Sequence, residues 1–128
     1  MSKASAPSQR MLRAGELIRH ALAEVFARGE THDPEFDKLG VSVVEVQMSP
    51  DLKIATAFVR PLILGKEQKL LFACTRNQKY IRGLIAPKLA MKFMPQIRFR
   101  ADTALEYAAK IDDLLKNPVV ARDLEKDA

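Results

Sequence analysis

The sequence has few of the residues that build disulfides, membrane spans and secretion signals. It contains a single cysteine, Cys74, which excludes an internal disulfide and suits a reducing compartment. No run approaches the roughly 18 apolar residues that a membrane-spanning helix needs. The N-terminal segment MSKASAPSQR lacks the apolar core that marks a signal peptide. We therefore expect a cytoplasmic protein that does not cross a membrane.

Aromatic and glycine residues are also scarce. Tryptophan is absent and there are two tyrosines, so the sequence offers no aromatic platform for stacking nucleic-acid bases. The five glycines are isolated from one another and form no Gly-rich loop for phosphate. His20 and His32 have no second histidine or cysteine at metal-ligand spacing. We predict neither a metal site nor a cofactor.

The reactive groups that remain fit structural roles better than catalytic ones. Cys74 falls on the apolar side of a short predicted helix, as a small core residue does. Asp102 and Glu106 are four residues apart at a predicted helix start, where carboxylates favour the helix dipole and the cap. We therefore predict that the protein is not an enzyme.

Positive charge is what the sequence does have, and it is concentrated in residues 76–100. The chain carries 21 Lys and Arg against 16 Asp and Glu, a net charge of +5. Residues 76–100 contain no carboxylate, and their cations are Arg76, Lys79, Arg82, Lys88, Lys92, Arg98 and Arg100. Such a run suits a polyanion, because each cation set against a phosphate releases condensed counterions. Solvated faces usually mix the two signs, so we predict contact with RNA or DNA here.

The cations are expected on more than one element. On an unbroken helical wheel, Arg76, Lys79 and Arg82 share one face. Arg10 and Arg13 lie at the start of the first predicted helix, where a structural role and RNA contact are both open. If they contact RNA, they extend the basic surface.

Local signals place the first helix and the first two strands. Ser8 is a suitable N-cap for a helix that runs to about residue 28 and ends at Gly29, and Gly15 should weaken it by about 1 kcal/mol relative to Ala. A polar, acidic loop follows at residues 31–38. Residues 41–48 and 53–60 predict two strands that pair antiparallel across a turn at residues 49–51. Their predicted inner faces are Val44, Val46 and Met48, and then the small residues Ala55, Ala57 and Val59.

The second half predicts two helices, a strand and a last helix. The helices span residues 65–75 and about 77 to 88 or 91, with a bend at Pro87. Residues 96–101 alternate as a strand that turns Arg98 and Arg100 to one side. The last helix spans residues 102–116. The order α-β-β-α-α-β-α gives an α+β domain at residues 8–116, with a flexible arm at 1–7 and a flexible tail at 117–128.

Three stretches, in the right order and spacing, resemble the ribosome-binding factor A family. Residues 10–13 (RMLR) with Ile18 and Arg19 resemble the family's opening helix. Residues 44–59 (VEVQMSPDLKIATAFV) resemble its strand-turn-strand signature. The third match runs from IR at 81–82 to LAMKFMPQIRFRAD at 89–102. Together they cover about residues 8–116.

The resemblance implies a type II KH-like fold, a three-stranded sheet packed by helices on one face. It also implies a monomeric, non-enzymatic ribosome assembly factor. Such a factor binds the free small (30S) ribosomal subunit, assists maturation and 5′-end processing of its 16S rRNA, and leaves before translation. Growth in the cold is where the family matters most.

One departure from the family lies between the two middle helices. The family typically has an Ala-x-Gly kink, whereas this chain has Asn77, Gln78 and Lys79 at the equivalent place. Asn77 is expected to cap the second helix, so a bend is still possible. Lys79 adds a cation there, and we hypothesise a salt-dependent gain in RNA affinity.

Two other functions stay open on the residues alone. One is an RNA-processing enzyme of other specificity, such as a nuclease that uses Asp and Glu around a metal, although no convergent carboxylate set is visible. The other is a KH-like adaptor whose apolar residues meet a partner protein.

Overall fold

The structure, a computed structural model, describes residues 6–102. Its elements are α1 (Gln9–Ala27), α2 (Pro34–Leu39), β1 (Ser42–Met48), β2 (Ile54–Arg60), α3 (Glu67–Arg76), α4 (Gln78–Ile85), the 3₁₀ helix η1 (Ala86–Lys88) and β3 (Gln96–Ala101). The class is α+β, as expected, and within the described residues α2 is an α-helix that was not expected. The predicted last helix and tail, and most of the predicted arm, lie outside the described residues, so the predicted domain boundaries stay predictions.

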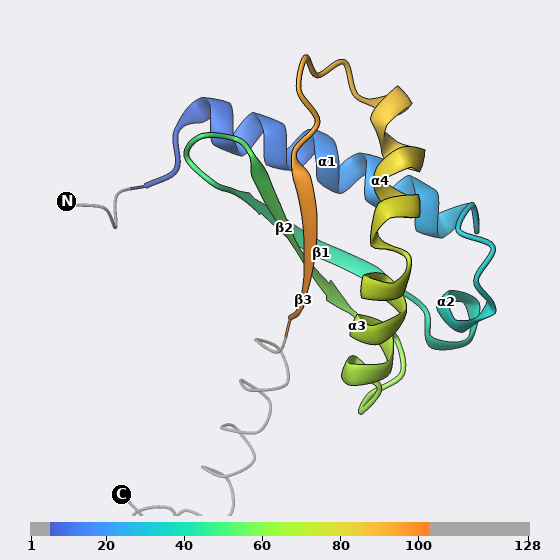
Figure 1. The fold of residues 1–128 in the computed structure, drawn as a ribbon. Helices are drawn as coiled ribbons and strands as arrows, with labels where there is room; N and C mark the ends of the chain where they lie inside the picture. The colour runs from blue at the N-terminus through green and yellow to red at the C-terminus, as the bar shows by residue number, and fades with distance from the viewer. Residues whose placement is uncertain (1–5, 103–128) are drawn as a thin grey trace, which may run out of the picture.

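The three strands form one mixed sheet in the order β1-β2-β3. Strands β1 and β2 pair antiparallel across their short turn, as predicted, whereas β2 and β3 pair parallel. A parallel partner needs a crossover connection, and α3 and α4 supply it. Figure 1 shows these two helices following one another alongside β3, with α1 running across the strands.

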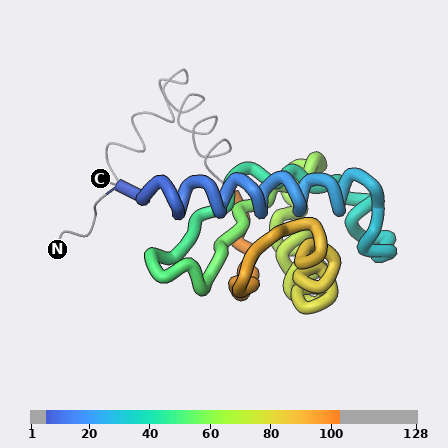
Figure 2. Tube along the Cα trace, turned by 90° about the horizontal axis from the view of Figure 1, so that it is seen from above, coloured from blue at the N-terminus to red at the C-terminus, as the bar shows by residue number. Residues whose placement is uncertain are grey.

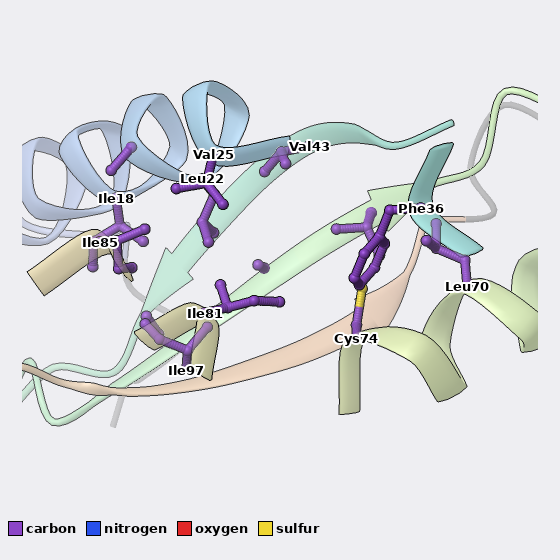
Figure 3. Packing of buried hydrophobic residues seen from close by; sticks show 14 of the residues in the cluster. Ile18, Leu22, Val25, Phe36, Val43, Leu70, Cys74, Ile81, Ile85 and Ile97 are labelled. Atoms are coloured by element: carbon purple, nitrogen blue, oxygen red, sulfur yellow. The ribbon is translucent and has the colours of Figure 1, made fainter. Parts of the chain in front are cut away.

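One face of the sheet carries the hydrophobic core. Ala55, Ala57 and Val59 of the central strand are completely buried, which confirms the predicted small-residue face. The described helices contribute their apolar stripes to this same cluster, including Ile18, Leu22, Val25, Leu70, Ile81 and Ile85 (Figure 3). Cys74 points toward the Phe36 ring in Figure 3 and is completely buried, and burial raises the pKa of its thiol to about 12. Cys74 is therefore a core residue, as predicted.

The first strand differs from its prediction. Val44 was expected on the inner face, but it is 40% exposed, and Val43 is buried instead. The cause is an irregularity in the ladder between Val43 and Glu45, where the pairing with β2 skips one residue. Such a bulge inserts an extra residue and reverses the alternation on one side of it. Met48, beyond the bulge, is buried as predicted.

Residues 31–38 hold a helix where we expected only a loop. The side chain of Asp33 accepts a hydrogen bond from the Glu35 N–H at 3.0 Å and caps α2, whose first residue is Pro34. The helix ends at Gly40, which has a φ of 72°. Proline at the first position and glycine after the last are ordinary helix boundaries, and buried Phe36 anchors the turn between them.

The prediction for the helix around Pro87 was also only partly right. The α-helix α4 ends at Ile85, and Pro87 lies in the 3₁₀ turn η1 that follows. Proline has no N–H to donate to the Gly83 carbonyl four residues back, so the α-helical pattern cannot continue through it. The backbone tightens into η1, and the helical segment ends at Lys88, the nearer of the two predicted ends, with a change of helix type in place of the predicted bend.

Gly15 brings α1 close to the sheet. A Cβ atom at this position would lie 2.5 Å from the Val46 carbonyl oxygen of β1. Cβ atoms in proteins essentially never make contacts shorter than 3.0 Å, so a side chain here would force the helix or the strand to shift. Gly15 is therefore not simply a weak point in α1, because its missing side chain sets the helix-to-strand distance.

We predict that Gly15→Ala destabilises the fold by about 1–2 kcal/mol, since overpacking costs about 1–3 kcal/mol and outweighs the gain of up to about 1 kcal/mol in helix propensity. Gly83→Ala is the matched control, because Gly83 is also helical but has nothing within 4 Å of the position that a Cβ atom would take. It should stabilise the protein by up to about 1 kcal/mol. Urea unfolding of both variants measures this. Equal gains in the two variants would contradict the close packing.

Candidate nucleic-acid interface

The fold separates the predicted RNA-contacting cations, and it pairs two of them with carboxylates. Arg76 donates to the Asp33 carboxylate at 2.7 Å, and its guanidinium lies 5.5 Å from the Phe72 ring centroid. Lys88 lies 3.1 Å from a Glu24 oxygen and 3.5 Å from a Glu30 oxygen. The Glu24 carboxylate, with Glu30, raises the pKa of Lys88. The charges of these two cations are therefore largely balanced by carboxylates of the same chain.

The helical wheel that placed Arg76, Lys79 and Arg82 together does not apply. Arg76 ends α3, and the other two belong to α4, because Asn77 separates the helices with φ −102° and ψ 11°. The Asn77 side chain does not cap α4, as we had expected. It donates back to the Ala73 carbonyl at 2.9 Å and to Asp33 at 2.8 Å.

The other residues of the predicted kink point in different directions. The Gln78 side-chain amide donates to the Ile97 carbonyl and so occupies a backbone acceptor of β3. Lys79 is exposed, with no carboxylate of the described residues within ion-pair distance. The junction is thus fixed to α2 by Asn77 and to the sheet by Gln78, and it leaves one cation at the surface.

Arg82 has a structural partner as well as a charge. Its Nε donates to the Pro95 carbonyl and its terminal nitrogen to the Met94 carbonyl, both at 2.9 Å. These bonds tie α4 to the segment that leads into β3. Because carbonyl oxygens do not neutralise a guanidinium, Arg82 keeps its net positive charge at the surface.

Arg98 and Arg100 lie on the face of the sheet that is turned away from the core. Ile97 of the same strand is completely buried, and the alternation of β3 turns both arginines to the opposite side. They stand beside Thr56 and Phe58 of the central strand. Both are exposed, as predicted from the strand pattern.

Arg10, Arg13 and Lys92 come together at a groove of about 480 Å³. The first two project from the start of α1, and Lys92 comes from the segment before β3. Figure 2 shows the β1–β2 turn and that segment on the same side of α1. The turn adds Lys53, a cation that the sequence analysis did not select. No local pattern in the sequence indicates that these three segments meet.

Other site chemistry is limited in the described part of the chain. No group of three or more His, Cys, Asp or Glu side chains in residues 6–102 is placed to hold a metal ion. No helix within these residues is both long and apolar enough to cross a membrane.

Comparison with known proteins adds to this geometry. The family model described as ribosome-binding factor A matches residues 10–115 of the chain. The chain belongs to the ribosome-binding factor A family. This agrees with the three sequence stretches, whose residues form α1, the β1–β2 hairpin and the α4–β3 region.

Relatives within the family match over nearly the whole chain. Ribosome-binding factor A of Rhizobium meliloti (strain 1021) is 50% identical over 128 residues, which cover 99% of this chain and 95% of the relative. That of Brucella ovis is 53% identical over 121 residues, which cover 94% of this chain and 81% of the relative.

Solved structures of the family share the fold. The crystal structure of ribosome-binding factor A from Thermus thermophilus is similar with a TM-score of 0.61 and 22% identity, covering 71% of this chain and 94% of that one. A Thermus thermophilus homology model fitted into a cryo-EM map of a 30S–ribosome-binding factor A complex has a TM-score of 0.55 and 25% identity, over 68% and 89% of the two chains.

Asp33 provides a test of the contacts at the α3–α4 junction. Its hydrogen bond from Arg76, with those from Glu35 and Asn77, lowers the pKa of the carboxyl from 3.8 to about 2. Asp33→Asn keeps a capping side chain but removes the charge, so we expect a loss of about 0.2–1 kcal/mol at neutral pH. Asp33→Ala also removes the cap and should cost about 1–2 kcal/mol.

The effect of pH has a defined sign. The lowered pKa means that the charge of Asp33 stabilises the fold above pH 3.8, and that this contribution is lost as the pH falls toward 2. Urea unfolding should therefore show the difference between wild type and Asp33→Asn shrinking over this range. A difference that persists unchanged at pH 2 would contradict the ion pair.

Proposed function

We propose that the protein is a cytoplasmic, monomeric assembly factor that binds the free small ribosomal subunit. It assists maturation of the 5′ end of 16S rRNA without catalysing a reaction, and it serves growth in the cold. Support comes from family membership and from the fold's likeness to the Thermus thermophilus protein that was fitted into a 30S complex.

The observation that carries the proposal is a set of cations that the fold leaves without ion pairs. Among the described residues, no carboxylate lies within ion-pair distance of Arg10, Arg13, Lys79, Lys92, Arg98 or Arg100. Each is available to a phosphate, and such contacts supply affinity and orientation without reading a base sequence. That is the requirement for a factor that recognises the shape of a folded RNA.

A non-catalytic factor can still direct RNA maturation. If it binds one RNA conformation better than another, it raises the occupancy of that conformation by its difference in affinity. Phosphate contacts on separate elements suit this mechanism, because only an RNA that meets them together gains all of them. An RNA-processing enzyme would instead cleave precursor RNA with magnesium alone, and an adaptor would bind a partner protein without dependence on salt.

We predict that the full-length protein in cell extract sediments with free small subunits and not with translating ribosomes. The double charge reversal Arg98→Glu, Arg100→Glu should abolish this co-sedimentation, since both phosphate contacts become repulsive. The matched control is Lys38→Glu, Lys69→Glu, which reverses two exposed cations outside the predicted set and should leave sedimentation unchanged. Sedimentation of wild type with translating ribosomes, or equal losses in both variants, would count against the proposal.

Substitution of Lys79 tests the cation that stands at the end of the segment where the family typically has an Ala-x-Gly kink. Lys79→Ala should lower affinity for a 16S rRNA fragment and reduce the slope of log affinity against log salt by about 0.7–0.9, the value for one lost phosphate contact. Filter binding across a salt series measures both. Lys69→Ala, on α3, is the control and should change neither. If Lys79→Ala leaves both quantities at their wild-type values, Lys79 does not contact RNA.

A further inference from the structure

The groove beside α1 combines an apolar floor with a cationic rim. Its floor and walls include Leu17 of α1, Met48 and Leu52 of the hairpin, and Met91 and Met94 before β3. Phe93 stands at the same site and is 78% exposed, with the Lys92 ammonium 5.6 Å from its ring centroid. A large aromatic side chain held this far into solvent has no packing role in the described fold.

The cations of the rim stand on three different walls. Arg10 and Arg13 belong to α1, Lys53 to the hairpin turn, and Lys92 to the segment before β3. The one carboxylate among the lining residues is Asp51, and the turn already uses it. Its oxygen accepts from the Ser49 hydroxyl at 2.6 Å and from the Lys53 N–H at 3.0 Å. These neutral donors leave Asp51 charged, but the lining still carries four cations against one carboxylate, so an anion entering the groove meets a net positive charge.

We propose that this groove holds one unpaired nucleotide of RNA, its base against Phe93 and the methionines and its flanking phosphates on the rim cations. The proposal rests on the proposed function and names a subsite for it. A nucleotide within a strand has a phosphate on each side of its sugar, and its base projects from that sugar, which matches an apolar floor between cationic walls. The volume of about 480 Å³ falls within the range of about 300–1,000 Å³ typical of sites for one small molecule.

An acidic peptide is the competing occupant, and the arrangement favours the nucleotide. A flat base stacks on an exposed phenyl ring and on thioethers, and every base has such a face. The sequence alone offered no aromatic platform. The groove supplies a single stacking position, because the fold brings Met48 of β1 to the same groove as Phe93 and Met94 of the segment before β3.

The test compares two hexanucleotides of equal charge, one wholly abasic and one with a single central adenosine. Calorimetry at low ionic strength with the full chain should show at least about fivefold tighter binding of the adenosine-bearing strand, since one stacked base contributes about 1–3 kcal/mol. Phe93→Ala should bring this ratio close to one. Arg13→Ala should weaken both strands and leave the ratio unchanged.

The matched control is Phe72→Ala, which removes another exposed phenylalanine, 68% accessible and outside the groove, and should preserve the ratio. Equal binding of the two strands by wild type, no binding up to millimolar concentration, or an unchanged ratio in Phe93→Ala would overturn the proposal. So would tighter binding of a glutamate-rich peptide with one central leucine. Failure of the proposed function is seen separately, as a wild-type chain that prefers the adenosine strand but does not sediment with small subunits.

Discussion

The structure depends on how closely its helices approach the sheet. The central strand presents only Ala55, Ala57 and Val59 to the core, all completely buried, and Gly15 lets α1 reach the backbone of β1 at Val46. These small residues leave room over the sheet for the large aliphatic side chains of the helices, such as Ile18, Leu22 and Ile81, which are completely buried. With the described helices on one face, the alternation of β3 sends its arginines to the other. The packing of the helices on one face of the sheet therefore determines that Arg98 and Arg100 lie on the other face.

The fold also divides the cations of residues 76–100 into those that are paired with carboxylates and those that are not. Arg76 meets the carboxylate of Asp33 at the N-cap of α2, and Lys88 meets carboxylates of α1 and of the loop after it, so these contacts join segments far apart in the chain. Exposed ion pairs contribute little stability, so their larger effect is to remove two cations from the surface charge. The cations that remain lie at the groove, at the start of α4 and on the sheet. The surface proposed to meet RNA therefore consists of a few fixed positions and not of a continuous basic helix.

Much of the fold follows from local signals in the sequence, and the exceptions have physical reasons. Ser8, the small face of β2 and the alternation of β3 each act within a few residues, and each was predicted correctly. Val44 was misplaced because a bulge is a property of two paired strands, and one strand's pattern does not record it. The Asn77 side chain was predicted to cap α4, but it donates to Asp33, which lies 44 residues away and could not be identified from the local sequence.

The candidate site was less predictable for the same reason. The cations of residues 76–100 could be named from composition, but their ion pairs could not, since Asp33 and Arg76 are 43 residues apart. The groove was not visible at all, because its lining comes from α1, a hairpin turn and the segment before β3. Phe93 and Lys53 have no local signal that separates them from ordinary surface residues.

Arg82 connects the groove to the sheet face. Its two hydrogen bonds hold the carbonyls of Met94 and Pro95, and these two residues link the groove lining to the first residue of β3. A single backbone segment therefore carries Lys92 and Phe93 at one end and Arg98 and Arg100 at the other. Fixing its middle to α4 sets the spacing between the two surfaces, so Arg82 holds the groups proposed to contact RNA in position. The sequence shows only that Arg82 is charged. Its hydrogen bonds to the Met94 and Pro95 carbonyls show that it also holds the segment between the groove and β3 against α4.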